Sequence, residues 1–286
     1  MTARIVWLAS YPKSGNTWFR VFLNTIREET ITSPDINDLY STPIASSRGI
    51  FEEHAGLEAS DLTLDETDRL RPDVYRHLAA SLEEPMFMKV HDAYTKTSAG
   101  EWMFPTEVTR VVIYLVRNPL DVAVSFANHN SQGIDRAVEN LCNKEFCLCR
   151  GIKNLPNQLR QIHLTWSSHA ASWLDSPNSV CVIRYEDMKL EAFATFKRAV
   201  QFLKLDKSDE EIRAAIETCS FDRLQNQEKE NSFNEKPQNC KSFFRKGIVG
   251  DWRAHLTEKQ VDRIIESHYG MMRKLNYLDA NDQLTV

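Results

Sequence analysis

One stretch, residues 11–18 (YPKSGNTW), indicates the fold most directly, because it joins a short apolar run to a helical pattern. The run before it, residues 4–9 (RIVWLA), has the composition of a strand that is buried on both faces. The residues after it, 17–27, carry large apolar side chains at helical spacing. A strand, a loop and a helix in this order open a βαβ unit, and the turn between them is a favourable place for an anion.

Further apolar runs along the chain predict the rest of a sheet; they are residues 86–90, 110–116 and 180–184. Because helical patterns separate these runs, the strands are expected to pair in parallel, with helices covering both faces of the sheet. The sequence therefore predicts the α/β class. It shows no internal repeat and no linker composition, so we expect one domain over residues 1–286 with its core at about 4–276.

The helical patterns have recognisable starts and stops. Asn118 is an expected N-cap, with Pro119 at the first helical position and Asp121 in the first turn. The other predicted helices cover residues 58–82, 159–174, 190–203, 208–219 and 258–275, with a boundary at Arg71-Pro72 and a cap at Thr257. Three polar segments are predicted to be irregular, namely residues 30–56, 129–158 and 222–242.

Composition limits the kinds of partner that the protein can have. The chain has 286 residues and a formal net charge of −5, so a surface built as a whole for nucleic acid is not expected. No apolar run approaches the roughly 20 residues of a membrane span, and the chain enters its first strand too early for a signal peptide. We therefore expect a cytoplasmic protein with no nucleic-acid or membrane partner; the sequence does not reveal its oligomeric state.

The six cysteines are expected to be reduced in that compartment. Cys142, Cys147 and Cys149 form a cluster, but their C-x4-C-x-C spacing matches a zinc site poorly. We interpret them as structural thiols, with metal binding and redox chemistry as less favoured readings, and no metal site is predicted.

The loop at residues 11–18 has the groups that hold a phosphate. Lys13 brings a full positive charge, Ser14 and Thr17 bring hydroxyl donors, and Gly15 allows the backbone to approach an anion closely. The loop is not a Walker A motif, since its lysine precedes the only glycine. A capped turn with a surface lysine is the simpler alternative for this segment taken alone.

Two later segments offer further cationic groups. The strand at 110–116 ends at Arg117, whose planar fork can hold a phosphate but not a metal ion, and Ser125 lies two helical turns further on. Residues 244–252 (FRKGIVGDW) place Arg245 and Lys246 before Gly247. A structural arginine and a solvated basic turn are the respective alternatives.

Three blocks, residues 12–18 (PKSGNTW), 114–125 (YLVRNPLDVAVS) and 244–252, resemble in the same order the signatures of cytosolic-type sulfotransferases. These enzymes use 3′-phosphoadenosine 5′-phosphosulfate (PAPS) as donor and release PAP. The resemblance implies a P-loop NTPase-like sulfotransferase fold, and we expect a bacterial member. It also implies a set of donor-binding residues: Lys13, Ser14, Gly15, Asn16, Thr17, Trp18, Arg117, Ser125, Tyr185, Phe221, Phe244, Arg245, Lys246 and Gly247.

The adenine contacts follow from the same resemblance. The family stacks the base on the tryptophan of its first block, here Trp18, and uses the tyrosine of a Y-E-D segment, here Tyr185. A family T-S-F triplet is Cys219-Ser220-Phe221 in this chain. Phe221 can still pack on the base, whereas the thiol of Cys219 is a weak donor in place of a hydroxyl.

The general base is expected near the end of the second strand run. Lys89 and His91 are two residues apart, so on a strand their side chains point the same way. The family has K-x-H here, which implies that His91 takes the proton of the acceptor hydroxyl and that Lys89 is a neighbouring cation. It further implies metal-independent in-line displacement, in which Lys13 stabilises the leaving oxygen and Ser125 restrains Lys13. His163, His169 and His255 are interpreted as packing or surface residues.

Two other functions are kept as alternatives. A nucleotide-dependent kinase would need magnesium, and Arg117 stands where many kinases have an acidic metal ligand. A nucleotide sensor that has lost catalysis would bind PAP tightly and transfer nothing.

The acceptor is expected to be a small hydroxylated molecule, with steroids, phenols and glycopeptides as other classes open by resemblance. Residues 30–105 and 126–160 are expected to shape its pocket. The aromatic residues that could line it, or simply pack in the core, are Tyr94, Trp102, Phe104, Phe126 and Phe146.

Overall fold

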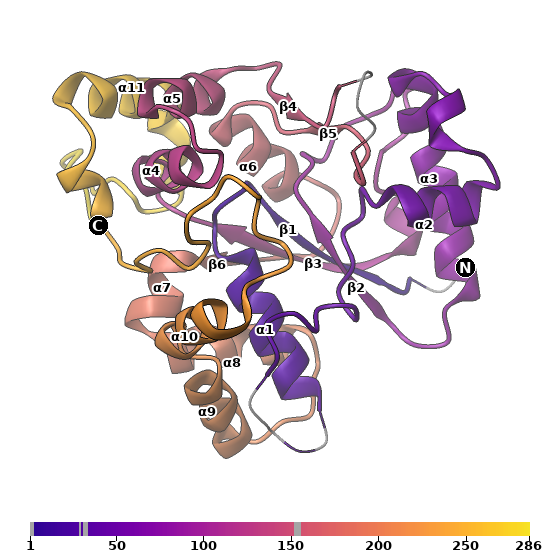
Figure 1. Ribbon diagram of the computed structural model, residues 1–286, viewed down its shortest axis with the longest axis horizontal. Coiled ribbons are helices and arrows are strands. Elements are labelled where there is room, and N and C mark those ends of the chain that lie inside the picture. The colour runs from indigo at the N-terminus through magenta and orange to yellow at the C-terminus, as the bar shows by residue number, and fades with distance from the viewer. Residues whose placement is uncertain (1–2, 29, 31–33, 152–155) are drawn as a thin grey trace. The chain divides into compact units, whose positions relative to one another are not determined.

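A computed structural model describes residues 3–28, 30, 34–151 and 156–286 of the chain. Its central sheet has four strands in the order β2-β1-β3-β6 (Figure 1). Their bounds are Ile5–Ser10 for β1, Met86–Val90 for β2, Thr109–Val116 for β3 and Val180–Arg184 for β6. β1 and β2 run parallel, with Ile5 opposite Met86 at the start of the register. The predicted α/β class, with a parallel sheet flanked by helices, is confirmed.

The chain forms two compact units whose segments alternate along the sequence. The first unit consists of Met1–Tyr11, Thr42–Tyr114 and Asn143–Cys181, and the second of Pro12–Ser41, Leu115–Cys142 and Val182–Val286. β3 and β6 each begin in the first unit and end in the second. Because both units draw on distant parts of the sequence, neither corresponds to a continuous piece of chain; one domain over residues 1–286 stays a prediction.

The first unit has a core of aromatic side chains. The ring of Trp7 on β1 lies 5.2 Å from that of Tyr75 and 5.1 Å from that of Phe104, and all three are fully buried. Besides β1 and β2, this unit contains α2 (Arg48–Ala55), η1 (Ala59–Asp61), α3 (Leu64–Ser81), η2 (Thr106–Val108), β4 (Cys147–Leu148), β5 (Gln161–Ile162) and α6 (Trp166–Leu174). Helices α2 and α3 lie side by side (Figure 1).

The second unit packs helices around phenylalanine rings. Phe22 of α1 and Phe196 of α8 have ring centroids 4.2 Å apart, and Phe19 stacks on Phe196 at 6.1 Å. The helices of this unit are α1 (Asn16–Arg27), α4 (Pro119–His129), α5 (Ile134–Cys142), α7 (Tyr185–Leu190), α8 (Ala192–Phe202), α9 (Asp209–Thr218), α10 (Phe221–Asn231), η3 (Asp251–Ala254) and α11 (Glu258–Lys274).

The predicted helix caps are confirmed. The side chain of Asn118 accepts a hydrogen bond from the backbone N–H of Leu120, and Pro119 opens α4. Thr257 caps α11 and shares a capping box with Gln260. These short-range contacts satisfy N–H groups that a helix start leaves open, which is why the sequence predicted these starts within a residue.

The predicted boundary at Arg71-Pro72 is wrong, because α3 continues through Pro72. Pro72 removes one helical hydrogen bond, but side-chain contacts of the neighbouring residue Arg71 hold this turn of the helix in place. The Arg71 guanidinium is 1% exposed and forms an ion pair with Asp92 at 3.0 Å, while its Nε donates to the Tyr75 hydroxyl. These tertiary contacts compensate for the missing backbone bond.

Several polar segments contain more regular structure than predicted. The described parts of 30–56, 129–158 and 222–242 include α2, α5 with β4, and most of α10, respectively. Each of these helices buries one narrow stripe, such as Leu224 and Glu228 in α10, so its overall polarity resembled that of a loop. The helix predicted from residue 159 begins at Trp166, because Gln161–Ile162 pair with Cys147–Leu148 as strands. The helix predicted over 190–203 starts at Ala192 instead, since Leu190 ends α7.

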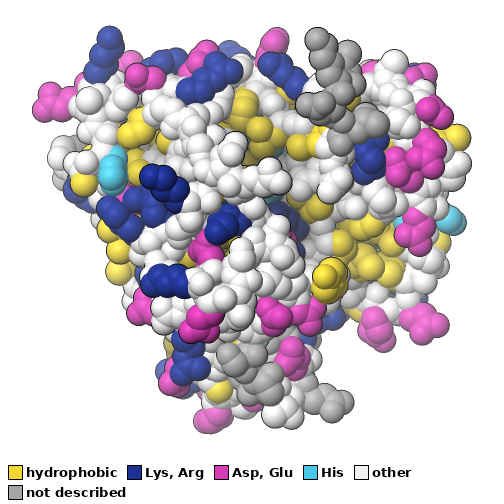
Figure 2. All heavy atoms as spheres, viewed as in Figure 1, with side chains coloured by type: hydrophobic (Ala, Val, Ile, Leu, Met, Phe, Trp, Pro, Cys, Tyr) yellow, Lys and Arg dark blue, Asp and Glu magenta, His cyan; other side chains and the backbone are white. Residues whose placement is uncertain are grey.

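The surface carries both signs of charge. Lys and Arg side chains are interspersed with Asp and Glu over the face shown in Figure 2. Among the helices of the described residues, none is long and apolar enough to span a bilayer.

Candidate active site

The loop after β1 has a backbone that few sequences can adopt. Gly15 precedes α1 with a φ of +93°, and a Cβ added there would lie 2.8 Å from Cδ2 of Tyr185 and 2.9 Å from Cε of Met188. Lys13 also has a positive φ, +71°, which is unusual for a residue with a side chain. Glycine is therefore required at position 15 by the backbone conformation and by the close approach of α7. The sequence did not reveal the approach of α7.

Two buried donors near this loop have no hydrogen-bond partner among the described residues. One is the hydroxyl of Ser14, a residue that is 0% exposed, and the other is Nε of Arg117. A buried polar group without a partner costs free energy, typically about 1–3 kcal/mol, so such groups are retained where a ligand satisfies them. Both residues were predicted to bind the donor nucleotide.

Arg117 is held in place by three contacts within the second unit. Its Nη2 donates to the carbonyl oxygen of Ile248 at 3.0 Å and lies 3.5 Å from a carboxylate oxygen of Asp121. The guanidinium carbon lies 4.2 Å from the ring centroid of Tyr185, which is the geometry of a cation–π contact. Tyr185 in turn touches Gly15, as described above, so these contacts connect the first and second predicted blocks.

Lys13 has partners that the sequence did not suggest. Its ammonium donates to Nδ1 of His129 at 3.2 Å and lies 3.9 Å from the ring centroid of Phe243. His129 ends α4, and no sequence signal distinguishes it from the other histidines. Ser125, the predicted restraint of Lys13, lies on the same helix and is half-buried.

The third block presents its cations to a carboxylate. Arg245 and Lys246 both pair with Asp251, Lys246 at 2.8 Å. Burial alone would raise the pKa of Asp251, but hydrogen bonds from Lys246 and Arg245 lower it below 3.8. Gly247 has a φ of +62° and packs on Phe221, where a Cβ would lie 2.5 Å from the ring. This contact links the third block to the predicted adenine site.

Aromatic rings from three elements gather where the adenine was predicted. Trp18 of α1 makes an edge contact with Tyr185 at 6.0 Å, and its indole N–H donates to the carbonyl oxygen of Cys219 at 2.8 Å. The Lys189 ammonium lies 5.6 Å from Trp18 and 5.2 Å from Phe221. Predicted adenine contacts thus lie close together, and Lys189 joins them without having been predicted.

The thiol of Cys219 has a structural role. It donates to the Thr25 hydroxyl at 3.2 Å, and burial raises its pKa to about 11. Phe244 is likewise anchored, since its N–H donates to Glu228 at 2.8 Å. The Cys219 thiol, which the resemblance placed beside the adenine, therefore points toward Thr25 of α1 instead.

His91 follows β2 in the first unit, and its tautomer can be deduced. Its Nδ1 lies 3.0 Å from the carbonyl oxygen of Ser10, which can only accept, so Nδ1 carries the hydrogen and Nε2 keeps a lone pair. Burial lowers the pKa of His91 well below 6.5, and the positive charge of Lys89 lowers it further. The ring is therefore neutral at neutral pH, the state that a base requires.

Two more histidines lie near His91 and were predicted to be packing or surface residues. His163 and His169 are fully buried, with ring centroids 5.9 Å and 5.5 Å from that of Tyr11. Nε2 of His169 lies 3.1 Å from the carbonyl oxygen of His91, and its Nδ1 lies 2.9 Å from the Tyr114 hydroxyl. The packing prediction was correct, but it missed this hydrogen bond to the backbone of the proposed base.

The predicted site residues thus fall into two sets. In the second unit, contacts run from Gly15 through Tyr185 and Arg117 to Ile248, and from Gly247 to Phe221. In the first unit, Lys89 and His91 are neighbours at the end of β2. In the sequence, Ser10, whose carbonyl oxygen accepts from His91, precedes Lys13 by three residues.

The cysteines are all free thiols. In the part of the chain that the structure describes, no group of three His, Cys, Asp or Glu side chains is arranged to hold a metal ion. Cys142 lies 3.9 Å from Nε2 of His268, and Cys149 lies 3.8 Å from the amide nitrogen of Gln161. The structural role predicted for these thiols stays a prediction.

Comparison with known proteins identifies the same chemistry as the three blocks. A family model described as the sulfotransferase domain matches residues 4–275. Among similar proteins, Cytosolic sulfotransferase 10 of Arabidopsis thaliana is 28% identical over 90% of this chain and 74% of its own length. Flavonol 3-sulfotransferase of Flaveria bidentis is 27% identical over 91% and 78%, and amine sulfotransferase of Oryctolagus cuniculus is 23% identical over 90% and 77%. A bacterial source stays a prediction.

Solved structures share the fold. A mouse sulfotransferase complexed with PAP superposes with a TM-score of 0.61 at 22% identity, covering 96% of this chain and 86% of that one. Retinol dehydratase in complex with androsterone and PAP gives 0.60 at 20% identity, covering 98% and 84%. At these identities the likeness supports the fold and leaves the details of the site to the contacts described above.

Proposed function

The chain belongs to the sulfotransferase domain family, and from this membership we propose that it transfers a sulfuryl group from PAPS to an acceptor hydroxyl without a metal ion, with His91 as the general base. Transfer of a sulfuryl group is the activity of the family. The donor, the acceptor group and the residue roles are the proposal, argued below from the contacts of this chain.

The observation that carries the proposal is the pair of unsatisfied buried donors, Ser14 Oγ and Arg117 Nε. They belong to two different sequence blocks, which the contact of Gly15 with Tyr185 and of Tyr185 with Arg117 connects. A nucleotide with phosphates at both its 5′ and 3′ positions would satisfy both, and the rings of Trp18, Tyr185 and Phe221 suit its base. When bound, PAPS supplies the sulfuryl group and PAP as leaving group.

The residues of the chain have distinct tasks in this proposal. The backbone N–H groups at the start of α1, with Ser14 and Thr17, hold the 5′ end, and Arg117 holds the 3′ phosphate. The remaining donor contacts belong to Asn16, Ser125, Phe244, Arg245, Lys246 and Gly247. Lys13 stabilises negative charge on the leaving oxygen and Ser125 restrains Lys13 until the acceptor is present, while the hydrogen bond to His129 orients the ammonium.

His91 has the protonation state for its task. Because Nδ1 donates to the Ser10 carbonyl, Nε2 is left to accept the proton of an acceptor hydroxyl. Burial lowers the pKa of His91, and the positive charge of Lys89 lowers it further, so the ring stays neutral. Proton removal from the hydroxyl and fixed positive groups around the leaving oxygen together stabilise an in-line transition state, so the chemistry calls for no metal ion.

The test of donor binding is a comparison of two arginines, Arg110 near the start of β3 and Arg117 directly after its end. We expect Arg117→Met to weaken PAP binding by at least about tenfold, because it removes charge-assisted hydrogen bonds. Arg110→Met is the matched control, since Arg110 is exposed at the start of β3 and is expected to leave affinity unchanged. Equal PAP affinity of the two variants, measured by calorimetry, would contradict the assignment of Arg117.

The catalytic roles are tested by His91→Ala and Lys13→Ala with PAPS and a panel of hydroxylated acceptors. Both variants are expected to lose turnover by at least about a hundredfold, as is usual for a general acid–base group. Near-wild-type turnover would remove the residue from the mechanism. A chelator tests the kinase alternative, because the activity of a magnesium-dependent kinase would be lost. The sensor alternative predicts that the protein binds PAP but transfers no group to any acceptor.

Relatives of the chain support a small-molecule acceptor and a cytoplasmic location, which we propose for this protein as well. Solved neighbours bind androsterone or retinol, and relatives are named for flavonols and amines, which supports a small-molecule acceptor. Relatives named as cytosolic support a cytoplasmic location, to be tested by fractionation. We also propose that both units act as one domain.

A further inference from the structure

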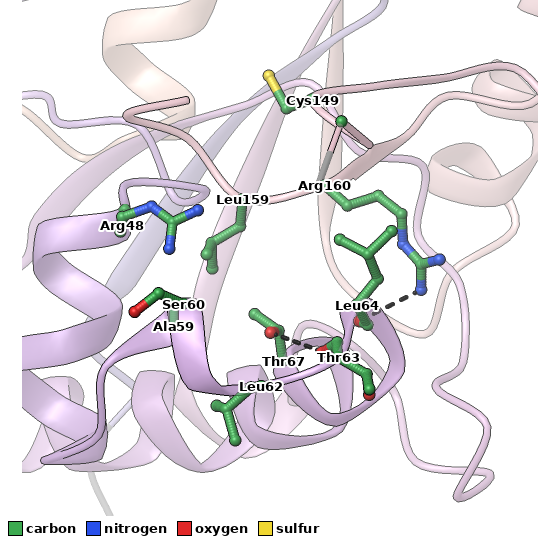
Figure 3. Close-up of a pocket in the computed structure, with 11 residues that line it drawn as sticks. Arg48, Ala59, Ser60, Leu62, Thr63, Leu64, Thr67, Cys149, Leu159 and Arg160 are labelled. Atoms are coloured by element: carbon green, nitrogen blue, oxygen red, sulfur yellow. Dashed lines mark hydrogen bonds between the residues drawn. The ribbon is translucent and has the colours of Figure 1, made fainter. Parts of the chain in front are cut away.

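A cavity in the first unit lies away from the residues assigned above. Arg48 of helix α2, residues of the segment 59–67, and Cys149, Gly151, Leu159 and Arg160 enclose about 120 Å³ (Figure 3). Apolar side chains form much of its wall, including Ala59, Leu64 and Leu159. An engineered apolar cavity of about 150 Å³ takes up benzene, so this space suits a group of a few carbon atoms.

Of the described residues that line this cavity, one sends a charged group into it. In Figure 3 the guanidinium of Arg48 points from the start of α2 into the space between Leu159 and Ser60. Its position is fixed, because its Nε donates to the carbonyl oxygen of Pro156 at 3.0 Å and its backbone N–H donates to Asn157. The side chain remains 19% exposed. Arg48 is therefore held in one orientation while part of it stays accessible.

The guanidinium of Arg48 retains unused donors. Its Nη1 lies 3.6 Å from a carboxylate oxygen of Glu52, beyond hydrogen-bond distance, and that carboxylate accepts from the N–H of Ala59. In residues 34–151 and 156–286 no acceptor is within hydrogen-bond distance of Nη1 or Nη2. Glu52 thus forms an ion pair with Arg48 without accepting a hydrogen bond from its Nη1.

The second cation at the cavity is already engaged. Arg160 donates to the carboxylate of Asp68 at 2.9 Å through Nε and to the carbonyl oxygen of Leu64 at 3.4 Å. In Figure 3 its guanidinium turns away from the space that Arg48 enters. Among the described residues that line this cavity, Arg48 is accordingly the cation with hydrogens to offer.

The walls of the cavity are attached to the strand end that carries His91. Ala45 donates to the carbonyl oxygen of Lys89 at 2.8 Å, and Ser46 accepts from Leu159 at 2.7 Å. On the other side, the N–H of Ile162 donates to Asp92 at 3.0 Å. Since three residues of chain span at most about 10 Å, Arg48 lies within that reach of Ala45. A small acceptor molecule has this length.

We propose that this cavity binds the far end of the acceptor, and that this end carries a carboxylate which Arg48 recognises. The inference rests on the proposed function and narrows it to hydroxylated carboxylic acids. An arginine with free N–H groups favours a carboxylate by geometry as well as by charge, and the leucine walls accept the carbon chain beside it.

The experiment compares a hydroxylated acid with its own amide. The probes are para-hydroxyphenylpropanoate and its carboxamide, which have nearly the same shape and differ in charge. We expect kcat/KM with PAPS to be at least about tenfold higher for the acid, the usual effect of a charge-assisted hydrogen bond. Arg48→Met is expected to remove this preference by lowering activity on the acid alone, and Arg48→Lys to retain part of it.

Activity on the carboxamide is the control, because it requires a folded enzyme and sulfuryl transfer but no recognition of a carboxylate. If Arg48→Met lowers activity on acid and amide equally, or if the wild type does not prefer the acid, the inference is overturned while transfer to the amide still supports the function. Arg136→Met, an exposed arginine on α5, is the control and is expected to retain the preference. If neither probe accepts a sulfuryl group, the affinities of the acid and the amide for the PAP-loaded enzyme are compared instead. Equal affinities overturn the inference.

Discussion

Nε2 of His169 donates a hydrogen bond to the carbonyl oxygen of His91 over 3.1 Å. A carbonyl can only accept, so Nε2 carries the hydrogen and Nδ1 of the same ring accepts from the Tyr114 hydroxyl at 2.9 Å. Tyr114 thereby fixes the tautomer of His169, and His169 fixes the backbone of the proposed base. Tyr114 and His169 are positioning residues in this arrangement, because they act through the peptide group of His91.

Replacing His169 by leucine is expected to lower kcat by about tenfold, because the carbonyl of His91 loses its donor. His169→Gln can present an amide N–H at a similar place and should recover part of this loss. Tyr114→Phe should resemble the leucine variant in direction. Steady-state kinetics checks this, with KM for PAPS expected to stay constant; equal losses of stability and activity in the Gln and Leu variants would contradict a positioning role.

Buried histidines are expected to make the fold sensitive to acid. Burial lowers the pKa of His163 and of His268 to about 4, and that of His169 to about 3. The unfolded chain takes up these protons near pH 6.5, whereas the folded chain does not, so stability falls as pH drops below about 6.5. Each histidine contributes about 1.4 kcal/mol per pH unit in this range.

Urea unfolding at about pH 7 and pH 5 measures this effect. In His268→Gln the loss of stability between these values should be smaller than in the wild type by about 2 kcal/mol, since one proton-binding group is gone. The same pH dependence in both proteins would show that His268 is not kept neutral by the fold.

Gly15→Ala is expected to damage donor binding through the backbone. The left-handed conformation costs alanine about 1–2 kcal/mol, and the new Cβ would also displace Tyr185. We expect PAP affinity to fall at least about tenfold. Gly100→Ala is the matched control, because Gly100 has a φ of +82° with no atom within 4 Å of an added Cβ. If both variants bind PAP as the wild type does, the packing of Gly15 on Tyr185 is not needed for the site.

The ion pair between Arg71 and Asp92 is expected to matter far more than a surface pair. Both side chains are at most 2% exposed, and Asp92→Asn leaves the buried Arg71 guanidinium with only the longer ion pair to Asp68 at 3.8 Å, so we expect a cost of about 3 kcal/mol. Glu139→Gln breaks the exposed pair with Arg136 and should cost less than about 0.5 kcal/mol. Chemical denaturation gives both values, and similar losses in the two variants would refute the distinction.

The strands and their order of appearance were predictable from sequence because they are continuous apolar runs. Each of the four predicted strands agrees with the structure within about a residue, and so do the helices that begin with strong caps, such as those at Asn118 and Thr257. The polar helices α2, α5 and α10 were not predictable from sequence, because a narrow buried stripe in a polar segment gives little periodic signal.

The sequence alone was enough to predict the family, which the comparisons confirm, and the blocks that we propose bind the donor. Backbone turns and adjacent cations at a strand end are local features that short motifs record. Only the tertiary structure decided that Lys13 meets His129, that His169 holds the backbone of His91, and that Arg48 enters a cavity. Each of these arrangements brings together residues that are far apart in the sequence. Burial and the choice of hydrogen-bond partner depend on such contacts, and no local pattern of residues encodes them.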